Sequence, residues 1–372
     1  MPELSSGGIM RIFHCDHCQQ LVFFENVQCI VCKHSLAYLP DIAEIGSLEQ
    51  VDDALWKARA PAAYGRLYRL CRNYSQQNVC NWAVPAGDPN PYCTSCRLTR
   101  VIPALDRSGR LEAWYALEVA KRRLVYSLMA LGLPLASKSE DPKQGLAFEF
   151  LADPEAGTSG ATKVLTGHAD GVITVNIAEA DDAEREKRRV SMHEPYRTLL
   201  GHFRHEIGHY YWDRLVRDSA HLDGFRKLFG DERPDYAAAL NAYYQSGPPA
   251  GWQDHFISAY ASSHPWEDWA ETWAHYLHLT DTLETASECG LALLPNRHNA
   301  GPVRPSSSVR KPGVAPFDEM MTDWFAVTYL LNNLSRGLGQ KDSYPFVLME
   351  PVIAKLKFIH EVCTAAVANR DH

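Results

Sequence analysis

Long apolar segments are missing from this chain of 372 residues. It contains no run of about 18 or more apolar residues, which is the length that a membrane-spanning helix needs. Residues 1–12 also lack the apolar run of a signal peptide. We therefore expect no membrane association and a cytoplasmic location.

An excess of positive charge is missing too. The chain has 37 Lys and Arg residues against 45 Asp and Glu residues, so its formal net charge is −8 and no overall attraction to nucleic acid is expected. Within residues 58–100, however, Asp88 is the only acid. The basic residues of this part are Arg59, Arg66, Arg69, Arg72, Arg97 and Arg100. Such a patch can bind RNA or an acidic partner, but we favour a solvated surface.

Cysteine is scarce after residue 96: eight of the ten cysteines lie within the first 96 residues. The first four form two Cys-x-x-Cys pairs, Cys15 with Cys18 and Cys29 with Cys32. Without a signal peptide, such pairs are typical of metal ligands rather than of disulfides. Four thiolates around one ion make a closed, structural zinc site. The pairs therefore predict a zinc ribbon.

A second set of four cysteines is more loosely spaced. It consists of Cys71, Cys80, Cys93 and Cys96, and only its last two members form a Cys-x-x-Cys pair. We predict a second structural zinc ion here, so that the chain carries one or two structural ions in all.

The segment His205-Glu206-Ile207-Gly208-His209 carries the clearest chemical signal. Two histidines at i and i+4 of a helix project from one face and can share one zinc ion. Glu206, between them, can accept the proton of a water molecule that zinc activates. The alternative is a core helix with satisfied histidines. A predicted strand at 171–177, ahead of this helix, favours the catalytic interpretation, because zincin-type peptidases have one in that place.

A catalytic zinc ion needs a third protein ligand and an open position. Trp212 and Leu215 stand where a metzincin would have Gly and His, so that class is excluded. Farther along, Glu267 and Glu271 are i,i+4 partners on a predicted helix over 265–279. They resemble the gluzincin arrangement, in which the first acid is the third ligand and the second hydrogen-bonds a ligand histidine. A solvated acidic face is the alternative.

Two further roles have candidates. Asp213 is a weaker choice for the third ligand. For the group that stabilises the oxyanion, we place Tyr260 first and His264 second, followed by Tyr243 and Tyr244.

Several longer segments resemble the zinc-binding metallopeptidases that carry an N-terminal zinc ribbon. They include Cys93-Thr94-Ser95-Cys96-Arg97-Leu98, Leu165-Thr166-Gly167-His168-Ala169-Asp170-Gly171, Tyr196 to Glu206, and His264-Pro265-Trp266-Glu267-Asp268-Trp269-Ala270-Glu271. The resemblance covers nearly the whole chain and shows no departure at the metal positions. It implies zinc and a zincin fold more firmly than it implies peptide cleavage.

These observations predict an α+β fold with a zincin-like metallopeptidase domain behind small four-cysteine zinc modules. We place a zinc ribbon in 1–40, a second zinc-binding module with a helical linker in 41–105, and the metallopeptidase domain in 106–372. The linker helix is expected within 48–74. Other helices are expected at 111–131, after an N-cap at Ser108, and at 318–338 and 351–367, with strands at 145–151 and 171–177 and a mobile loop at 299–316.

The expected activity is hydrolysis of a peptide or protein, with Glu206 as general base and the strand at 171–177 as the edge strand that pairs with the substrate. Partner proteins are expected to bind through the ribbons. Two rivals stay open: a non-enzymatic adaptor that binds protein or RNA through its ribbons, and a hydrolase of non-peptide amides that uses the same site.

Overall fold

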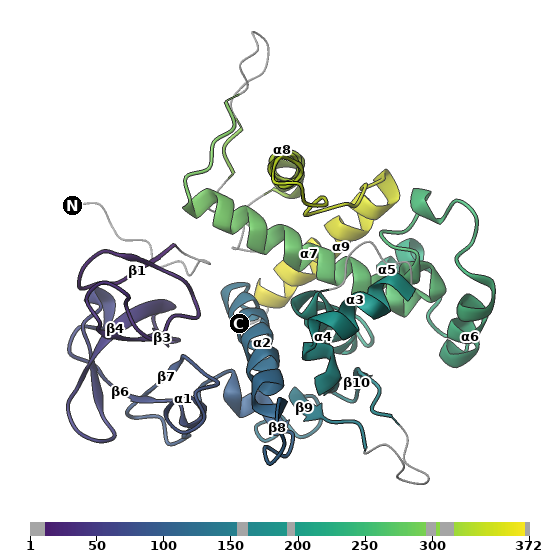
Figure 1. The fold of residues 1–372 in the computed structure, drawn as a ribbon. Helices are drawn as coiled ribbons and strands as arrows, with labels where there is room; N and C mark the ends of the chain where they lie inside the picture. Colours follow the sequence, from purple (N-terminus) through teal and green to yellow (C-terminus); the bar gives the residue numbers. More distant parts are fainter. Residues whose placement is uncertain (1–11, 155–162, 192–197, 295–302, 306–315, 369–372) are drawn as a thin grey trace.

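The computed structural model describes residues 12–154, 163–191, 198–294, 303–305 and 316–368. A β-rich N-terminal part lies beside a larger, mainly helical part (Figure 1). The predicted α+β class is therefore confirmed. Most of the loop predicted at 299–316 lies outside the described residues.

The N-terminal part is built on short antiparallel strands. β1 (Phe13–His14) pairs with β2 (Leu21–Val22), and a five-stranded sheet follows with the order β3-β4-β5-β6-β7. Its strands are β3 (Ser35–Leu39), β4 (Glu44–Gln50), β5 (Trp56–Ala58), β6 (Leu67–Leu70) and β7 (Ala83–Pro85). A bridge between Tyr38 and Trp82 brings the first strand of the sheet to the last. The sheet continues across residue 40, and the predicted domain boundary there stays a prediction.

The helix predicted within 48–74 is wrong. Its apolar spacing fits a helical face, but the segment forms the end of β4 and then β5 and β6, and its one α-helix is the short α1 (Arg72–Ser75). Pro61 begins a 3₁₀ turn between these strands, and Gly65 has a φ of +79°. Both residues favour a turn over a continuous helix, so the linker is a strand pair.

The second part contains a mixed sheet in the order β10-β11-β9-β8. Its strands are β8 (Thr99–Val101), β9 (Ala147–Leu151), β10 (Gly167–Ala169) and β11 (Val172–Asn176). β11 is parallel to β9 and antiparallel to β10. The strand predicted at 171–177 exists, but its assignment as the edge strand is wrong. Asp170 and Gly171 have positive φ and form a tight turn, so β10 folds back and takes the edge.

Helices make up most of this second part. They are α2 (Arg110–Ala130), α3 (Asp182–Ser191), α4 (Leu199–Leu215), α5 (Leu222–Phe229), α6 (Tyr236–Ser246), α7 (Pro265–Glu288), α8 (Phe317–Gly337) and α9 (Glu350–Ala368). The residue that caps α2 is Gly109, in a left-handed conformation, rather than the predicted Ser108. Within the described residues no helix is long and apolar enough to cross a membrane.

An aromatic cluster joins the two parts. Phe24, Tyr38 and Trp82 of the N-terminal part pack with Tyr126 of α2, with ring centroids 4.5–6.3 Å apart. All four side chains are less than a tenth exposed. The N-terminal part is therefore packed against α2, as Figure 1 also shows.

Candidate metal centre

The centre depends on a close approach of α4 and α7. A Cβ atom at Gly208 would lie only 3.0 Å from the Cα atom of Ala270. The indole Nε1 of Trp269 donates a hydrogen bond of 2.9 Å to the carbonyl of Gly208. Small residues on both helices thus bring their polar side chains within reach of each other.

Three of those side chains converge. Nε2 of His205 lies 3.2 Å from Nε2 of His209 and 3.0 Å from Oε2 of Glu267. Oε1 of Glu267 lies 3.6 Å from Nε2 of His209. All three residues are less than a tenth exposed. They form one of the groups in the described part of the chain that could hold a metal ion.

The hydrogen bond between His205 and Glu271 determines which ring nitrogen of His205 can bind a metal ion. Nδ1 of His205 lies 2.7 Å from Oε1 of Glu271 and donates its proton there, so Nε2 is the ring nitrogen left to bind a metal ion. The other oxygen of Glu271 accepts a 2.7 Å hydrogen bond from Ser258. Burial alone would lower the pKa of His205, but Glu267 and Glu271 raise it well above its usual value, so without metal a proton on Nε2 occupies the place between His205 and Glu267 that a metal ion would take.

The spacing fits zinc. With metal–ligand distances of about 2.1 Å, two ligand atoms of a tetrahedral zinc ion are about 3.4 Å apart. The two histidine nitrogens are 3.2 Å apart, and each has an oxygen of Glu267 nearby, Oε2 at 3.0 Å from His205 and Oε1 at 3.6 Å from His209. Oε2 of Glu267 and Nδ1 of His209 have no hydrogen-bond partner among the described residues. An ion bound by the three side chains would satisfy the carboxylate oxygen.

Glu206 lies beside this group and is 5% exposed. Burial alone would raise the pKa of its carboxyl, but His202 and the two metal-site histidines hold the pKa below its usual value. The carboxylate is therefore ionised and able to accept a proton.

Tyr236, a residue that the sequence reasoning missed, also reaches the centre. Its hydroxyl donates a 2.5 Å hydrogen bond to Oε1 of Glu267. Burial, together with the charge of Glu267, raises the pKa of this phenol well above its usual value. Tyr236 begins α6, far from the motif in sequence, and its residue type alone carries no signal for this contact. Ser258 was missed for the same reason.

The other candidates from the sequence make different contacts around the centre. The ring of Tyr260 is 6.0 Å from that of His205, centroid to centroid. His264 caps α7, because its Nδ1 accepts a hydrogen bond from the backbone N–H of Trp266. Asp213 pairs with Arg217 at 2.5 Å and is not part of the metal-site group. Tyr243 packs against Tyr260.

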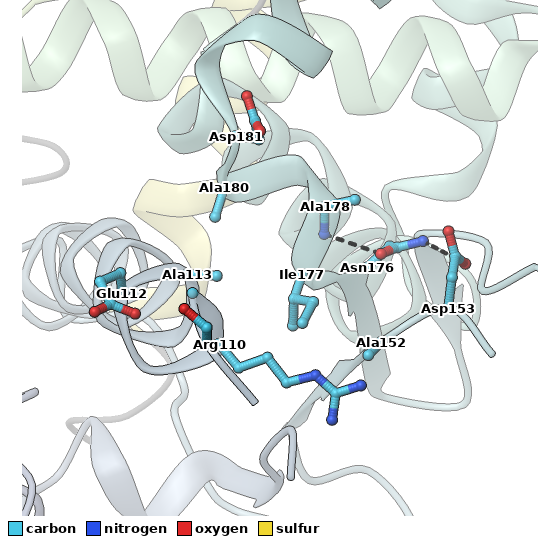
Figure 2. A pocket seen from close by; sticks show the side chains of 12 residues that line it. Arg110, Glu112, Ala113, Ala152, Asp153, Asn176, Ile177, Ala178, Ala180 and Asp181 are labelled. Carbon is cyan, nitrogen blue, oxygen red and sulfur yellow. Dashed lines mark hydrogen bonds between the residues drawn. The ribbon is translucent and has the colours of Figure 1, made fainter. Parts of the chain in front are cut away.

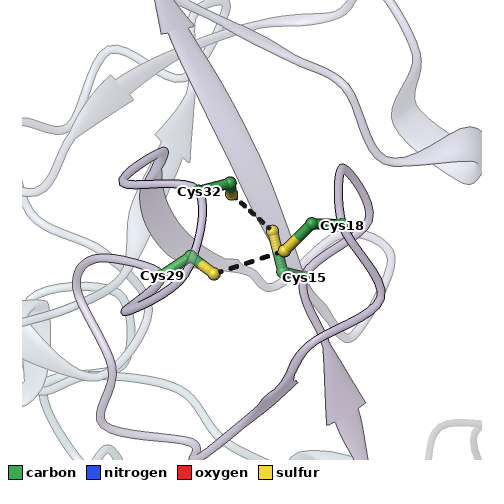
Figure 3. A group of neighbouring side chains, drawn as sticks. All are labelled: Cys15, Cys18, Cys29 and Cys32. Carbon is green, nitrogen blue, oxygen red and sulfur yellow. Dashed lines mark hydrogen bonds between the residues drawn. The ribbon is translucent and has the colours of Figure 1, made fainter.

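The first cysteine set gathers at one point (Figure 3). Sγ of Cys15 lies 3.5 Å from Sγ of Cys32, and Sγ of Cys18 lies 3.6 Å from Sγ of Cys29. These distances are too long for disulfides, and two thiolates on a tetrahedral zinc ion are about 3.8 Å apart. The geometry fits a structural zinc site.

The second cysteine set gathers in the same way but is fully buried. Sγ of Cys80 lies 3.8 Å from Sγ of Cys93. Burial raises the pKa of the Cys93 thiol well above its usual value, so a thiolate there needs a cation. Glu118 of α2 lies against this set, with an oxygen 3.9 Å from Sγ of Cys96. Lys121 is 2.9 Å from Glu118 and balances its charge.

The arginines of residues 58–100 are mostly paired. Arg59 contacts Glu49, Arg66 contacts Asp41, Arg97 contacts Asp88, and Arg100 contacts Glu149, at 2.5–3.5 Å. These ion pairs neutralise much of the patch and give no support to binding of RNA.

A cavity of about 480 Å³ lies elsewhere, where the start of α2 meets the end of β11 (Figure 2). Arg110, Asp153, Asn176 and Asp181 are among its lining residues. Asn176 donates a 2.8 Å hydrogen bond to Asp153, which links the ends of β11 and β9 on one side of the cavity. The lining contains no residue of the metal-site group.

Comparison with known proteins agrees with this geometry. Residues 110–362 match the family model described as "Putative zinc-binding metallo-peptidase", and residues 12–107 match a zinc-ribbon domain. The chain is 42% identical over 356 residues to uncharacterized protein Mb2598c of Mycobacterium bovis and to uncharacterized protein Rv2568c of Mycobacterium tuberculosis. Each match covers 95% of both chains. No solved structure matches the chain significantly. The chain therefore belongs to this zinc-binding metallopeptidase family and carries an N-terminal zinc-ribbon domain.

Proposed function

We propose that this chain hydrolyses peptide bonds with one zinc ion held by His205, His209 and Glu267. The convergence of their three buried ligand atoms, with Glu271 behind His205, is the observation that carries the proposal. Bound there, zinc would lower the pKa of a water molecule and polarise the carbonyl group of the substrate.

The side chains around the ion divide the remaining work. Glu206, ionised and buried, takes the proton from the water molecule and later passes it to the leaving amine. Glu271 holds His205 in the tautomer that leaves Nε2 free to bind metal. The hydroxyl of Tyr236 holds one oxygen of Glu267. Tyr260, whose phenol keeps its proton because burial raises its pKa, is our candidate for stabilising the oxyanion.

The edge strand beside the site supports a peptide substrate. β10 packs against α4, and the ring of His168 on β10 stacks 6.4 Å from the ring of His209. Nε2 of His168 accepts a 3.0 Å hydrogen bond from the backbone N–H of Gly171, which fixes the turn beside the strand. A peptide that extends the sheet at β10 would pass next to the metal.

We further propose three zinc ions per chain, one catalytic and two structural, and a protein partner for the ribbons. Several apolar side chains of the first ribbon support such a partner. Leu21, Phe23, Ile30 and Val31 are each 59–79% exposed. A cytoplasmic location fits as well, because thiolate zinc sites persist in a reducing compartment.

Profiling of newly formed protein N-termini tests the activity. Cells that produce the wild-type chain are compared with cells that produce Glu206→Gln, which keeps the size of the side chain but cannot accept the proton. Peptide hydrolysis requires new N-termini that appear only with the wild type. Identical profiles, combined with cleavage of small amides by the purified wild type, would instead favour the amidohydrolase.

A further inference from the structure

His202 lies one helical turn before Glu206 on α4, between two carboxylates. Its Nε2 lies 3.4 Å from Oε1 of Glu206, and its Nδ1 lies 3.5 Å from Oε2 of Glu179. Glu206 is 5% exposed and Glu179 is 2% exposed. A chain Glu179–His202–Glu206 therefore leads from the end of the sheet to the side chain that we assign as general base.

The far end of this chain is held by the fold. Glu179 belongs to the short 3₁₀ helix Ile177–Ala180, which directly follows β11. Asn176 caps that helix by accepting a 3.0 Å hydrogen bond from the N–H of Ala178. Arg185 of α3 donates a 2.6 Å hydrogen bond to the carbonyl of Glu179. These contacts fix the backbone of Glu179, and its 2% exposed carboxylate lies next to the ring of His202.

We propose that Glu179 and His202 are positioning residues that hold the carboxylate of Glu206 for proton transfer, an inference that rests on the proposed function. A glutamate side chain has several rotatable bonds, and its rate as a base depends on where its oxygens lie. His202 holds Oε1 and leaves Oε2 to receive the proton from water. Glu179 lies on the other side of the His202 ring, where its charge attracts Nδ1 across 3.5 Å, a longer contact than the 2.7 Å hydrogen bond between Glu271 and His205.

A positioning role can be told apart from a merely structural one, in which the loss of His202 would disturb the fold or the zinc site. The side chain of His202 is 22% exposed, so its loss would open no closed cavity in the core. It is also absent from the metal-site group. Loss of His202 should therefore lower kcat while the zinc content and KM stay unchanged.

The kinetic experiment uses the zinc-loaded full chain and a quenched fluorescent peptide that the wild type cleaves and Glu206→Gln does not. We expect His202→Leu to lower kcat roughly ten- to a hundred-fold with KM unchanged. His202→Gln places an amide donor near the position of Nε2 and should recover much of that loss. His360→Gln removes a buried histidine of α9 that hydrogen-bonds Tyr276, farther along α7 than Glu271, and it serves as the control with full kcat. Equal losses in His202→Leu and His202→Gln, or a loss of zinc in either, would overturn the positioning role.

A second measurement needs no substrate. In the zinc-loaded chain with ¹⁵N-labelled histidine, the ring N–H protons of His202, assigned with His202→Gln, should exchange slowly with water. Glu179→Gln should alter the signal of the Nδ1 proton. Fast exchange of the His202 ring protons in the wild type, or an unchanged Nδ1 signal in Glu179→Gln, would overturn the proposed Glu179–His202 pair even if the enzyme is active. A wild type that cleaves no peptide overturns the proposed function instead, and the NMR result then decides only whether Glu179 and His202 form a pair.

Discussion

At the scale of single residues, the metal centre depends on which atom of each histidine carries a proton. Glu271 accepts a 2.7 Å hydrogen bond from Nδ1 of His205, and this leaves Nε2, 3.0 Å from Glu267, as the nitrogen that can bind the metal. The two glutamates therefore have unequal roles, although they are one turn apart on the same helix. Glu267 faces the metal position, and Glu271 faces the back of a ligand.

This difference gives a prediction for the two alanine variants. Glu267→Ala leaves two histidines and should yield protein that lacks the catalytic zinc while the structural ions remain. Glu271→Ala keeps all three ligands and should bind the same zinc roughly ten- to a hundred-fold more weakly. Titration of both variants with zinc against a competing chelator measures this. An empty site in Glu271→Ala together with a full site in Glu267→Ala would reverse the assignment.

At the scale of helices and strands, the sequence predicted the elements with strong periodicity. The helices expected at 318–338 and 351–367 correspond to α8 and α9, and the helix expected at 265–279 is the first part of α7. Apolar residues recur at helical spacing on the packed faces of α8 and α9, whereas α7 is buried around most of its circumference. The strand at 171–177 was predicted from the sequence, but its place between β10 and β9 was not, since strand order depends on tertiary contacts.

Two errors have local physical causes. The helix expected within 48–74 was inferred from apolar spacing, although Pro61 and Gly65 are turn signals. Asp170-Gly171 is a hairpin signal, and it was passed over when 171–177 was assigned to the edge. The contact from Tyr236 to Glu267 joins residues that no local pattern relates, so only the folded chain reveals it.

The packing of α4 on α7 can be tested at Gly208. In Gly208→Ala the new Cβ atom would lie 3.0 Å from the backbone of Ala270, so the helices must separate. We expect a loss of about 1–3 kcal/mol in the free energy of unfolding and weaker binding of the catalytic zinc. Gly337→Ala is the control, because that helical glycine has nothing within 4 Å of the added atom. Chemical denaturation and zinc titration measure both effects, and equal stability of the two variants would contradict the close packing.

At the scale of the whole molecule, the two cysteine sites differ in what they hold together. The first set lies in the turns between β1, β2 and β3 of the ribbon. The second is fully buried and contacts α2 of the metallopeptidase part through Glu118, while Arg122 of the same helix hydrogen-bonds the carbonyl of Val79. The second site therefore lies at the junction of the two parts.

Metal analysis should reflect all three sites. We expect purified protein to contain three zinc ions per chain, two of which leave slowly because thiolate cages are closed to chelators. Elemental analysis during chelator treatment gives the number and the rates. One ion or none in protein prepared without chelator would contradict this expectation.

Serine variants should separate the two structural sites. Cys15→Ser combined with Cys18→Ser should destabilise the ribbon and leave the catalytic zinc bound. Cys93→Ser should lower the melting temperature of the whole chain, because it removes a ligand at the junction with α2. Thermal unfolding followed together with zinc content distinguishes them, and an equal, local effect of both variants would argue against a junction site.

The central claim is that Glu206 acts as the general base of a zinc peptidase. Its most direct test is the turnover of a quenched fluorescent peptide library by purified wild type and Glu206→Gln, each brought to the same content of catalytic zinc. We expect Glu206→Gln to keep its fold and its zinc and to lose roughly a hundred- to ten-thousand-fold in kcat. Undiminished turnover by Glu206→Gln at full zinc occupancy would contradict the account.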